Sequence, residues 1–243
     1  MIEKKKLFIH GGSSLISKYL IKKLCFEFKE IHIFCRDIKK TKSNIEIENF
    51  KDLQFYFYEN ELENIDQTLK DIDKLPNDLS GVLWISGYTG NPYREFEDED
   101  LAKKNIDVNF VNPTIAITKL SKKIIKNKNN FICAISSVAG LRGRKKRLYY
   151  SASKGGLINF LSGLRQKLQN ELKVITIIPG YISTNSFSEK SPKFLISSPE
   201  KASEIIFQAI KKNKEIVYVN SLWRLIMFVI LLIPEVIYKK LNF

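Results

Sequence analysis

Short apolar runs alternate with longer stretches of helical periodicity along this chain, and this alternation restricts its fold more than any other feature. Strands separated by helices form βαβ units, which place parallel strands in one sheet with helices on both faces. We therefore expect a single α/β domain with a doubly wound parallel sheet of the Rossmann type. The apolar runs predict strands over 7–10, 31–35, 53–58, 81–85, 131–135 and 174–178, with a seventh over 215–219. Apolar spacing predicts helices over 15–28, 97–128 and 150–172.

Length and composition agree with that fold. The 243 residues suit one α/β domain, and 44% hydrophobic and 12% aromatic residues exclude a disordered chain. We assign residues 1–220 to the Rossmann domain and 221–243 to an apolar C-terminal helix. The aperiodic segment 181–199 is rich in Ser, Lys and Pro, so we expect a loop that acts as a lid.

Cysteine, histidine and charge counts narrow the functional classes. Three cysteines without a CxxC pair and two histidines predict neither a disulfide nor a metal site. With no signal peptide apparent, we expect a cytoplasmic protein. An excess of 40 Lys and Arg over 26 Asp and Glu, a net charge of +14, attracts nucleic acid, anionic lipid or phosphorylated substrates. No nucleic-acid-binding motif accompanies the charge, so we expect no nucleic acid partner.

Two motifs carry the candidate chemistry. The turn His10-Gly11-Gly12-Ser13-Ser14 joins the first predicted strand to a helix, where a backbone can approach a pyrophosphate at the helix N-terminus. A strand ending in Ser136 and Ser137 precedes the second motif, in which Tyr150 and Lys154 share one helix face. A nearby ammonium stabilises a phenolate and lowers the tyrosine pKa, which makes Tyr150 a usable general acid.

These motifs resemble those of the short-chain dehydrogenase/reductase family, in order and spacing, over nearly the whole chain. The family's TGxxxGxG turn corresponds to residues 10–17, and its YxxxK motif to Tyr150 and Lys154. Its catalytic serine falls on Ser137 and its asparagine on Asn109. Its Pro-Gly turn with a following threonine is found at 179–184.

The resemblance implies a role for each of these side chains. Ser137 would hydrogen-bond the substrate oxygen, and Tyr150 would exchange its proton. Lys154 would bind the nicotinamide ribose and lower the pKa of Tyr150, while Asn109 would hold a water linking Lys154 to solvent. Asn109 is alternatively a helix-kink residue without a chemical part. The residues implied in cofactor binding are Gly11, Gly12, Ser13, Ser14, Ile16, Arg36, Ser86, Gly87, Tyr150, Lys154, Pro179, Gly180, Ile182 and Thr184.

The chain departs from the family pattern mainly where the nucleotide would bind. Leu15 and Ser17 replace the second and third glycines of the turn, and Trp-Ile-Ser-Gly at 84–87 replaces Asn-Asn-Ala-Gly. The acidic residue that usually follows the third strand has no clear match near Tyr58 and Glu59. These changes concern the tightness of cofactor binding more than the chemistry.

The tip of the second predicted strand reports on cofactor preference. Cys35 stands where a site for NAD usually offers a carboxylate, and Arg36 with Lys39 and Lys40 suits a 2′-phosphate. Asp37 argues for NAD(H). We predict NADP(H), with NAD(H) as the alternative cofactor.

Within the family, the chain is most similar to the decaprenylphosphoryl-2-keto-ribose reductases, which reduce a lipid-linked keto sugar in cell-wall arabinan synthesis. The likeness rests on the Gly-Gly-Ser-Ser turn, a basic loop at 140–147 and the C-terminal run. The loop lies between Ser137 and Tyr150, so its cations would border the pocket and bind a phosphodiester or anionic headgroups; alternatively, it is a solvated loop. Those cations are Arg142, Arg144, Lys145, Lys146 and Arg147.

An unbroken apolar run occupies residues 225–233, flanked by Trp223, Arg224, Tyr238 and Lys239. A membrane-spanning helix needs about 20 apolar residues, so this run is too short to cross a bilayer. It fits an interfacial helix on an anionic membrane, or equally a helix buried between subunits of a homo-oligomer.

Three functions are compatible with these features. The first is a reductase of a keto group on a lipid- or nucleotide-linked sugar in cell-envelope polysaccharide synthesis. The second is a dehydrogenase for an apolar carbonyl of the steroid, retinoid or acyl type. The third, a non-catalytic nucleotide-sensing protein, is favoured by Leu15 and Ser17 but disfavoured by the complete set Asn109, Ser137, Tyr150 and Lys154.

Overall fold

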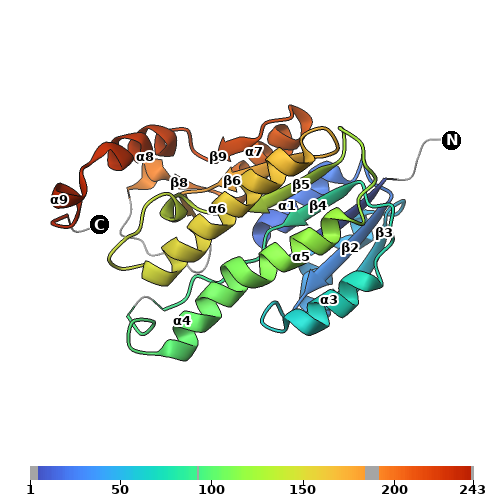
Figure 1. Cartoon of the computed structure of the whole chain (residues 1–243). Coiled ribbons are helices and arrows are strands. Elements are labelled where there is room, and N and C mark those ends of the chain that lie inside the picture. The colour runs from blue at the N-terminus through green and yellow to red at the C-terminus, as the bar shows by residue number, and fades with distance from the viewer. Residues whose placement is uncertain (1–4, 92, 184–191, 242–243) are drawn as a thin grey trace.

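The structure is a computed structural model that describes residues 5–91, 93–183 and 192–241. Within these residues, a seven-stranded parallel sheet has the order β3-β2-β1-β4-β5-β6-β9 (Figure 1). Its strands are β1 (Lys6–His10), β2 (Glu30–Cys35), β3 (Gln54–Glu59), β4 (Gly81–Trp84), β5 (Phe131–Ile135), β6 (Lys173–Ile178) and β9 (Ile216–Tyr218). The predicted Rossmann-type sheet is confirmed, including its seventh strand.

Helices cover both faces of the sheet (Figure 1). Their bounds are α1 (Leu15–Leu24), α2 (Ile38–Ile45), α3 (Ile65–Asp73), α4 (Glu99–Ile106), α5 (Asn112–Ser121), α6 (Leu148–Leu168) and α7 (Pro199–Lys211). Buried Leu20 of α1 and Ile206 of α7 share one apolar cluster, while Ile117 of α5 and Leu161 of α6 belong to a second. The five central strands are buried from both sides, because adjacent residues point to opposite faces and each face has its own helices, whereas the edge strand β3 contains no buried residue.

The helices differ from the sequence prediction at their ends. The helix predicted over 97–128 consists of α4, a π-helical turn at Asp107–Val111, and α5. Phe28, Ile124 and Leu172 continue the apolar pattern past the ends of their helices, because the core buries them as connecting residues. The helices α2, α3 and α7 were not predicted.

The segment predicted as a loop over 181–199 is partly ordered into strands. Its described ends form β7 (Tyr181–Ile182) and β8 (Ile196–Ser197), which pair in parallel with each other. Two residues per strand are too few to give a periodic pattern, so only their tertiary pairing identifies them.

The chain order predicts a ligand crevice at the carboxyl ends of β1 and β4. These strands are neighbours, yet the chain continues from β1 to β2 on one side and from β4 to β5 on the other. Such a reversal leaves a gap between the connections, where α/β proteins of this type bind ligands.

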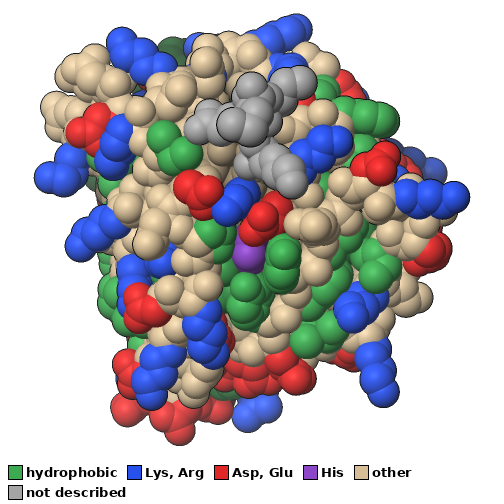
Figure 2. Space-filling view, turned by 90° about the vertical axis from the view of Figure 1, so that its right-hand side faces the viewer, with side chains coloured by type: hydrophobic (Ala, Val, Ile, Leu, Met, Phe, Trp, Pro, Cys, Tyr) green, Lys and Arg blue, Asp and Glu red, His purple; other side chains and the backbone are tan. Residues whose placement is uncertain are grey.

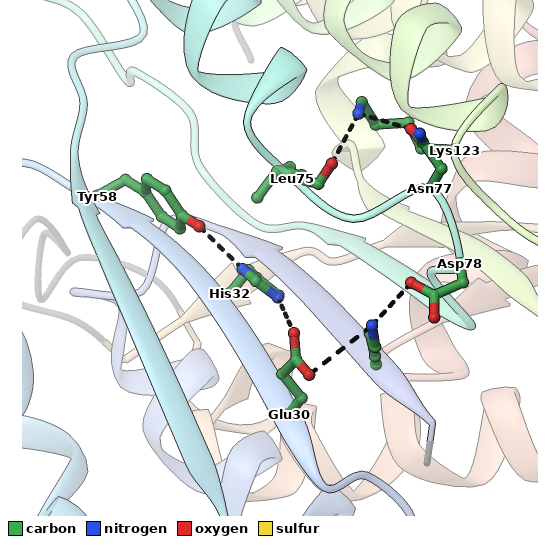
Figure 3. Close-up of polar contacts among 8 residues, drawn as sticks. Glu30, His32, Tyr58, Leu75, Asn77, Asp78 and Lys123 are labelled. Atoms are coloured by element: carbon green, nitrogen blue, oxygen red, sulfur yellow. Dashed lines mark hydrogen bonds and ion pairs between the residues drawn. The ribbon is translucent and has the colours of Figure 1, made fainter. Parts of the chain in front are cut away.

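The opposite end of the sheet, where the strands begin, carries a structural polar cluster (Figure 3). His32 lies 3.1 Å from the hydroxyl of Tyr58 and 2.6 Å from a carboxylate oxygen of Glu30. Lys6 pairs with Asp78 at 2.9 Å. Burial lowers the pKa of His32, and its two partners on β2 and β3 make it a link within the sheet. On this side of the molecule, acidic and basic side chains are intermixed around apolar ones (Figure 2).

Beyond β9, the chain forms α8 (Leu222–Leu232) and α9 (Glu235–Tyr238), which lie at the far end of the fold from β3 (Figure 1). Trp223 and Met227 of α8 are buried against Val138 and Ile178. Among the helices described here, none combines the length and apolarity needed to span a membrane.

Candidate active site

The turn between β1 and α1 has a backbone shape that permits close approach to a phosphate. Gly11 has a φ of +98°, and a Cβ there would lie 2.7 Å from the backbone nitrogen of Ser86. A Cβ on Gly12 would lie 2.2 Å from Cγ2 of Ile33. Ser14 caps α1 by accepting a hydrogen bond from the N–H of Ile16 at 3.2 Å. The positive end of the α1 dipole therefore borders the crevice.

A hydrogen bond accommodates the unusual Ser17 in this turn. Its buried hydroxyl donates to the carbonyl oxygen of Gly11 at 2.8 Å. The serine is thus tied to the turn itself. Leu15 is 39% exposed, and Ser13 contacts Thr41 of α2, hydroxyl to hydroxyl, at 2.9 Å. Ser17, at one of the two positions where the family has glycine, therefore contributes a side-chain contact that holds the turn.

The side chain of His10 stabilises the turn through hydrogen bonds, a role that the sequence pattern did not indicate. Its Nδ1 lies 2.6 Å from Oγ of Ser86, and its Nε2 lies 3.3 Å from Oδ1 of Asn60. Because an amide oxygen only accepts, Nε2 carries the proton and Ser86 donates to Nδ1. Burial lowers the pKa of His10 to about 4, so it is neutral near pH 7. The described residues contain no group of three His, Cys, Asp or Glu side chains arranged to hold a metal ion.

At the tip of β2, Arg36 and Asp37 gave opposing indications of cofactor preference, and the structure gives them different contacts. Asp37 caps α2 by accepting a hydrogen bond from the N–H of Lys40 at 2.9 Å. Arg36 is exposed, and within the described part of the chain its guanidinium has no hydrogen bond or ion pair. The carboxylate is therefore used within the fold, while the guanidinium is available to a ligand.

Asn109, Gly87 and Lys154 come together from three different elements. Asn109 lies in the π-helical turn, a distortion that is frequent at functional sites. Its side chain accepts from the N–H of Tyr88 at 3.0 Å and donates to the carbonyl of Tyr88 at 2.7 Å. A Cβ on Gly87 would lie 3.1 Å from both Oδ1 of Asn109 and Nζ of Lys154. The glycine therefore lets the lysine approach the asparagine.

Ser137 and Tyr150 meet at the end of β5. Ser137 begins a short 3-10 helix at Val138–Gly140, accepting a hydrogen bond from the N–H of Ala139 at 3.2 Å. Its hydroxyl also hydrogen-bonds Tyr150. The neighbouring Ser136 instead donates to the carbonyl of Lys154 at 2.8 Å, so it fixes α6 against β5. The structure thus distinguishes the two serines by their contacts.

The electrostatics of the tyrosine differ from the sequence-based expectation. Burial raises the pKa of Tyr150 above its ordinary value, while the hydrogen bond to Ser137 and the charge of Arg147 lower it. Burial also lowers the pKa of Lys154 to about 8. The Lys154 ammonium is 5.9 Å from the centroid of the Tyr150 ring and within 3.3 Å of the carbonyl oxygen of Ile135. The predicted lowering of the Tyr150 pKa by Lys154 is therefore not found here, because burial disfavours both charged forms.

The Pro-Gly turn after β6 borders the same site. The carbonyl of Pro179 accepts from the N–H of Val138 at 3.0 Å. A Cβ on Gly180 would lie 1.8 Å from Nε1 of Trp223, an α8 side chain that the sequence analysis took only as a flank. Ile182 follows in β7, whereas Thr184 lies outside the described residues. Contact between α8 and this turn required the tertiary structure, because Gly180 and Trp223 are 43 positions apart in the chain.

The basic loop at 140–147 is only partly available to a ligand. Arg142, expected to bind anions at the pocket mouth, instead donates to the carbonyl of Ile233 at 2.7 Å and pairs with Glu235 at 3.1 Å. This correction follows from helix electrostatics, because the carbonyls at the end of α8 attract a cation. Arg147 donates to the carbonyl of Thr89 at 2.7 Å, and its Cζ is 6.0 Å from the centroid of the Tyr150 ring.

Comparison with known sequences places these features in one family. The family profile described as short chain dehydrogenase matches residues 5–194. The 11-beta-hydroxysteroid dehydrogenase-like 2 of Arabidopsis thaliana is 23% identical over 252 residues, covering 98% of this chain and 81% of that protein. The 3-oxoacyl-[acyl-carrier-protein] reductase of Bos taurus is 26% identical over 134 residues, which cover 54% of this chain and 56% of its own length.

Solved structures show the same fold. A short chain dehydrogenase from Burkholderia cenocepacia J2315, in complex with NADP, has a TM-score of 0.77 at 17% identity and covers 99% of this chain and 98% of its own. A blue fluorescent protein from a metagenomic library, in complex with NADPH, has a TM-score of 0.76 at 16% identity, with 89% and 96% covered. None of these four proteins is named as a reductase of a lipid-linked keto sugar.

Proposed function

This chain belongs to the short chain dehydrogenase family, and on that premise we propose that it is an NADP(H)-dependent reductase of a keto group on a lipid- or nucleotide-linked sugar. The observation that carries the chemistry is the hydrogen bond between half-buried Tyr150 and Ser137, with Lys154 and Asn109 packed around Gly87. A proton donor and a hydroxyl that orients the substrate oxygen are what carbonyl reduction requires of the protein. Assembly of cell-envelope polysaccharides is the process that this substrate class suggests.

The nucleotide side of the crevice fits a dinucleotide phosphate. The turn from Gly11 to Ser14 and the first turn of α1 at Ile16 would hold the pyrophosphate. Arg36 would contact a 2′-phosphate. The Asp37 carboxylate caps α2 and so does not pair with the Arg36 guanidinium. Ser86, Gly87, Pro179, Gly180 and Ile182 would line the remaining side of the cofactor. When bound, the nicotinamide supplies the hydride.

The side chains of the protein would then transfer one proton to the substrate. Ser137 orients the substrate oxygen, and Tyr150 donates its hydroxyl proton to that oxygen. Lys154, whose pKa is about 8, carries a positive charge at neutral pH and would bind the nicotinamide ribose. Both polar groups of the Asn109 side chain are engaged by Tyr88, so a water link from Lys154 would use its main-chain carbonyl.

The sugar-linked substrate is supported by the remaining cations of the basic loop and by the likeness to reductases of lipid-linked keto sugars. Lys145 and Lys146 are exposed, and the loop directly precedes the helix that carries Tyr150. A phosphodiester next to the reacting keto group would pair with them. We further propose a homo-oligomeric, cytoplasmic protein in peripheral contact with the inner face of an anionic membrane.

An apolar carbonyl substrate is the second candidate. It is favoured by the exposed apolar residues of α8 and by the steroid and acyl chemistry in the names of the Arabidopsis and bovine relatives. The two candidates predict opposite substrate rankings. A nucleotide- or lipid-linked keto sugar should be turned over faster than an uncharged ketone if the first is correct.

Calorimetry with NADPH and NADH, followed by turnover of both substrate types, tests the proposal. We expect tighter binding of NADPH and NADPH oxidation that depends on a keto sugar. Failure to bind either cofactor would overturn the reductase assignment and favour a non-catalytic role. Faster turnover of the uncharged ketone would favour the second candidate, an enzyme for an apolar carbonyl substrate.

A further inference from the structure

The exposed apolar side chains of this protein are concentrated in the last described segment. Of the eighteen large hydrophobic residues that are exposed in the described chain, nine fall between Leu222 and Leu241. Leu225, Phe228 and Leu232 of α8 are 64%, 60% and 66% exposed. We call the exposed apolar residues of 222–241 the α8–α9 face. Contiguous exposed apolar surface of this kind marks an interaction site.

The fold holds α8 by its other side. Trp223 and Met227 are 7% and 5% exposed, and they pack against the strand end and turn that border the candidate active site. The α8–α9 face is therefore not needed to close the core. It is presented by a helix that is firmly attached through its buried side.

Arg142 fixes this segment to the loop that precedes Tyr150. Its guanidinium hydrogen-bonds the carbonyl of Ile233, pairs with Glu235, and stacks at 3.8 Å on the ring of Tyr238. The hydroxyl of Tyr238 in turn donates to the carbonyl of Gly143 at 2.6 Å. The α8–α9 face thus keeps a fixed position relative to the candidate active site.

A groove runs along α8 within this face. It has a volume of about 450 Å³ and is lined by Tyr218, Ser221, Arg224, Leu225, Phe228 and Leu231. Arg224 is the charged residue of this set, and no hydrogen bond or ion pair of its side chain occurs in the part of the chain described here. An apolar trough with an unpaired cation matches an anionic amphiphile, whose phosphate and acyl chain need those two environments.

Charge distinguishes a membrane from a second copy of the chain as the occupant. Glu235, the acid of this segment, is paired with Arg142. A two-fold contact between identical copies would place the same cationic surfaces against each other, which is unfavourable. An acidic leaflet would instead neutralise them. The cations near the face whose side chains form no ion pair within the described residues are Arg144, Lys145, Lys146, Arg224, Lys239 and Lys240.

We infer that the α8–α9 face lies flat on an anionic phospholipid leaflet, with a lipid phosphate at Arg224 and an acyl chain along Leu225, Phe228 and Leu231. With eleven residues, α8 is about 16 Å long, so it enters the interfacial layer without crossing the membrane. The inference deepens the proposed function and rests on it in one respect, namely that the leaflet would be the source of a lipid-linked substrate.

Flotation with phosphatidylglycerol–phosphatidylcholine vesicles tests the surface. Binding should rise with the phosphatidylglycerol fraction and fall as salt is raised, because the cationic part of the attraction is screened. The double variant F228N/L232N should reduce binding about tenfold or more. F26N is the matched control, because Phe26 is 88% exposed and lies in the loop between α1 and β2. It should leave binding unchanged.

The phosphate contact has its own pair of variants. R224E should weaken binding to acidic vesicles more than the control K51E, which changes an exposed lysine shortly before β3, whereas R224K should retain most of it. Equal effects of R224E and K51E would remove the lipid phosphate from Arg224. No flotation of the unchanged protein at low salt, or an altered oligomeric state of F228N/L232N by light scattering with unchanged flotation, would overturn the membrane inference. NADPH calorimetry on the same samples separates this failure from failure of the proposed reductase function.

Discussion

The two sides of the crevice show different tolerance to sequence change. On the nucleotide side, Leu15 and Ser17 occupy positions where the family has glycine, and His10 and Ser86 form a contact of their own. On the reaction side, Ser137, Tyr150 and Lys154 are all present at the family's spacing. The nucleotide side depends on a backbone shape that several side chains can support. The reaction side depends on particular functional groups.

Burial reinforces that contrast. Arg36 at the nucleotide side is exposed, whereas Lys154 is 4% exposed and has its pKa lowered to about 8 by burial. A buried cation lowers the free energy of unfolding. Lys154 therefore destabilises the fold, as expected of a residue that is kept for its chemistry. Four substitutions test this comparison, and they follow in order of expected effect.

The largest effect is expected for Tyr150→Phe. This change removes the proton donor and keeps the ring, so kcat should fall about 100-fold or more while NADPH affinity stays nearly constant. Steady-state kinetics with calorimetry would measure both. Tyr149→Phe, the same change one residue earlier, should leave kcat nearly unchanged. Near-normal turnover of the Tyr150 variant would show that the reaction side does not depend on this group.

Lys154→Met should lower kcat by less than Tyr150→Phe does, and it should stabilise the protein. The folded-state pKa of about 8 lies below the ordinary 10.5, so between these values the unfolded chain binds more protons and stability rises with pH. The burial penalty is therefore complete below about pH 8, and removing it should raise the free energy of unfolding at pH 7 by about 3 kcal/mol.

Urea unfolding at several pH values checks the sign of this effect. The advantage of Lys154→Met should shrink as pH rises towards 10.5, the ordinary pKa of the lysine. Lys167→Met, at an exposed position of the same helix, should show no such pH dependence. A Lys154 variant less stable than the parent at pH 7 would mean that its contacts outweigh its burial.

Arg36→Ala tests the nucleotide side at its exposed cation. Loss of a charge-assisted contact should weaken NADPH binding by about 1.5–3 kcal/mol and leave NADH binding nearly unchanged. Calorimetry with both cofactors measures the difference. Equal losses would indicate a structural role for Arg36 and remove the support for an NADP(H) preference.

The smallest effect is expected where the family glycine is restored. Ser17→Gly removes the hydrogen bond to the Gly11 carbonyl and adds backbone freedom within α1, so stability should fall by about 1–2 kcal/mol. NADPH affinity should not improve. Ser17→Ala keeps the Cβ and isolates the hydroxyl. Tighter NADPH binding by the glycine variant would show that Ser17 weakens cofactor binding instead of supporting the cofactor-binding turn.

The sequence was sufficient for those parts of the site that follow from local spacing. Tyr150 and Lys154 share a helix face because they are four residues apart, and Ser137 lies two residues beyond a strand that its apolar run predicts. The helix ends were less accurate, because buried connecting residues such as Phe28 extend the apolar pattern. The short strands β7 and β8 gave no periodic signal at all.

The seven strands of the sheet, the positions of the glycine turn and of the candidate catalytic side chains, and the excess of cations were determined by the sequence alone. Only the tertiary structure decided what those side chains touch. It placed Trp223 over Gly180, used Asp37 to cap α2, and directed Arg142 to the end of α8. The physical reason is that periodicity reports which face of an element is buried, whereas a contact between distant residues and the pKa it sets depend on packing that no local pattern records.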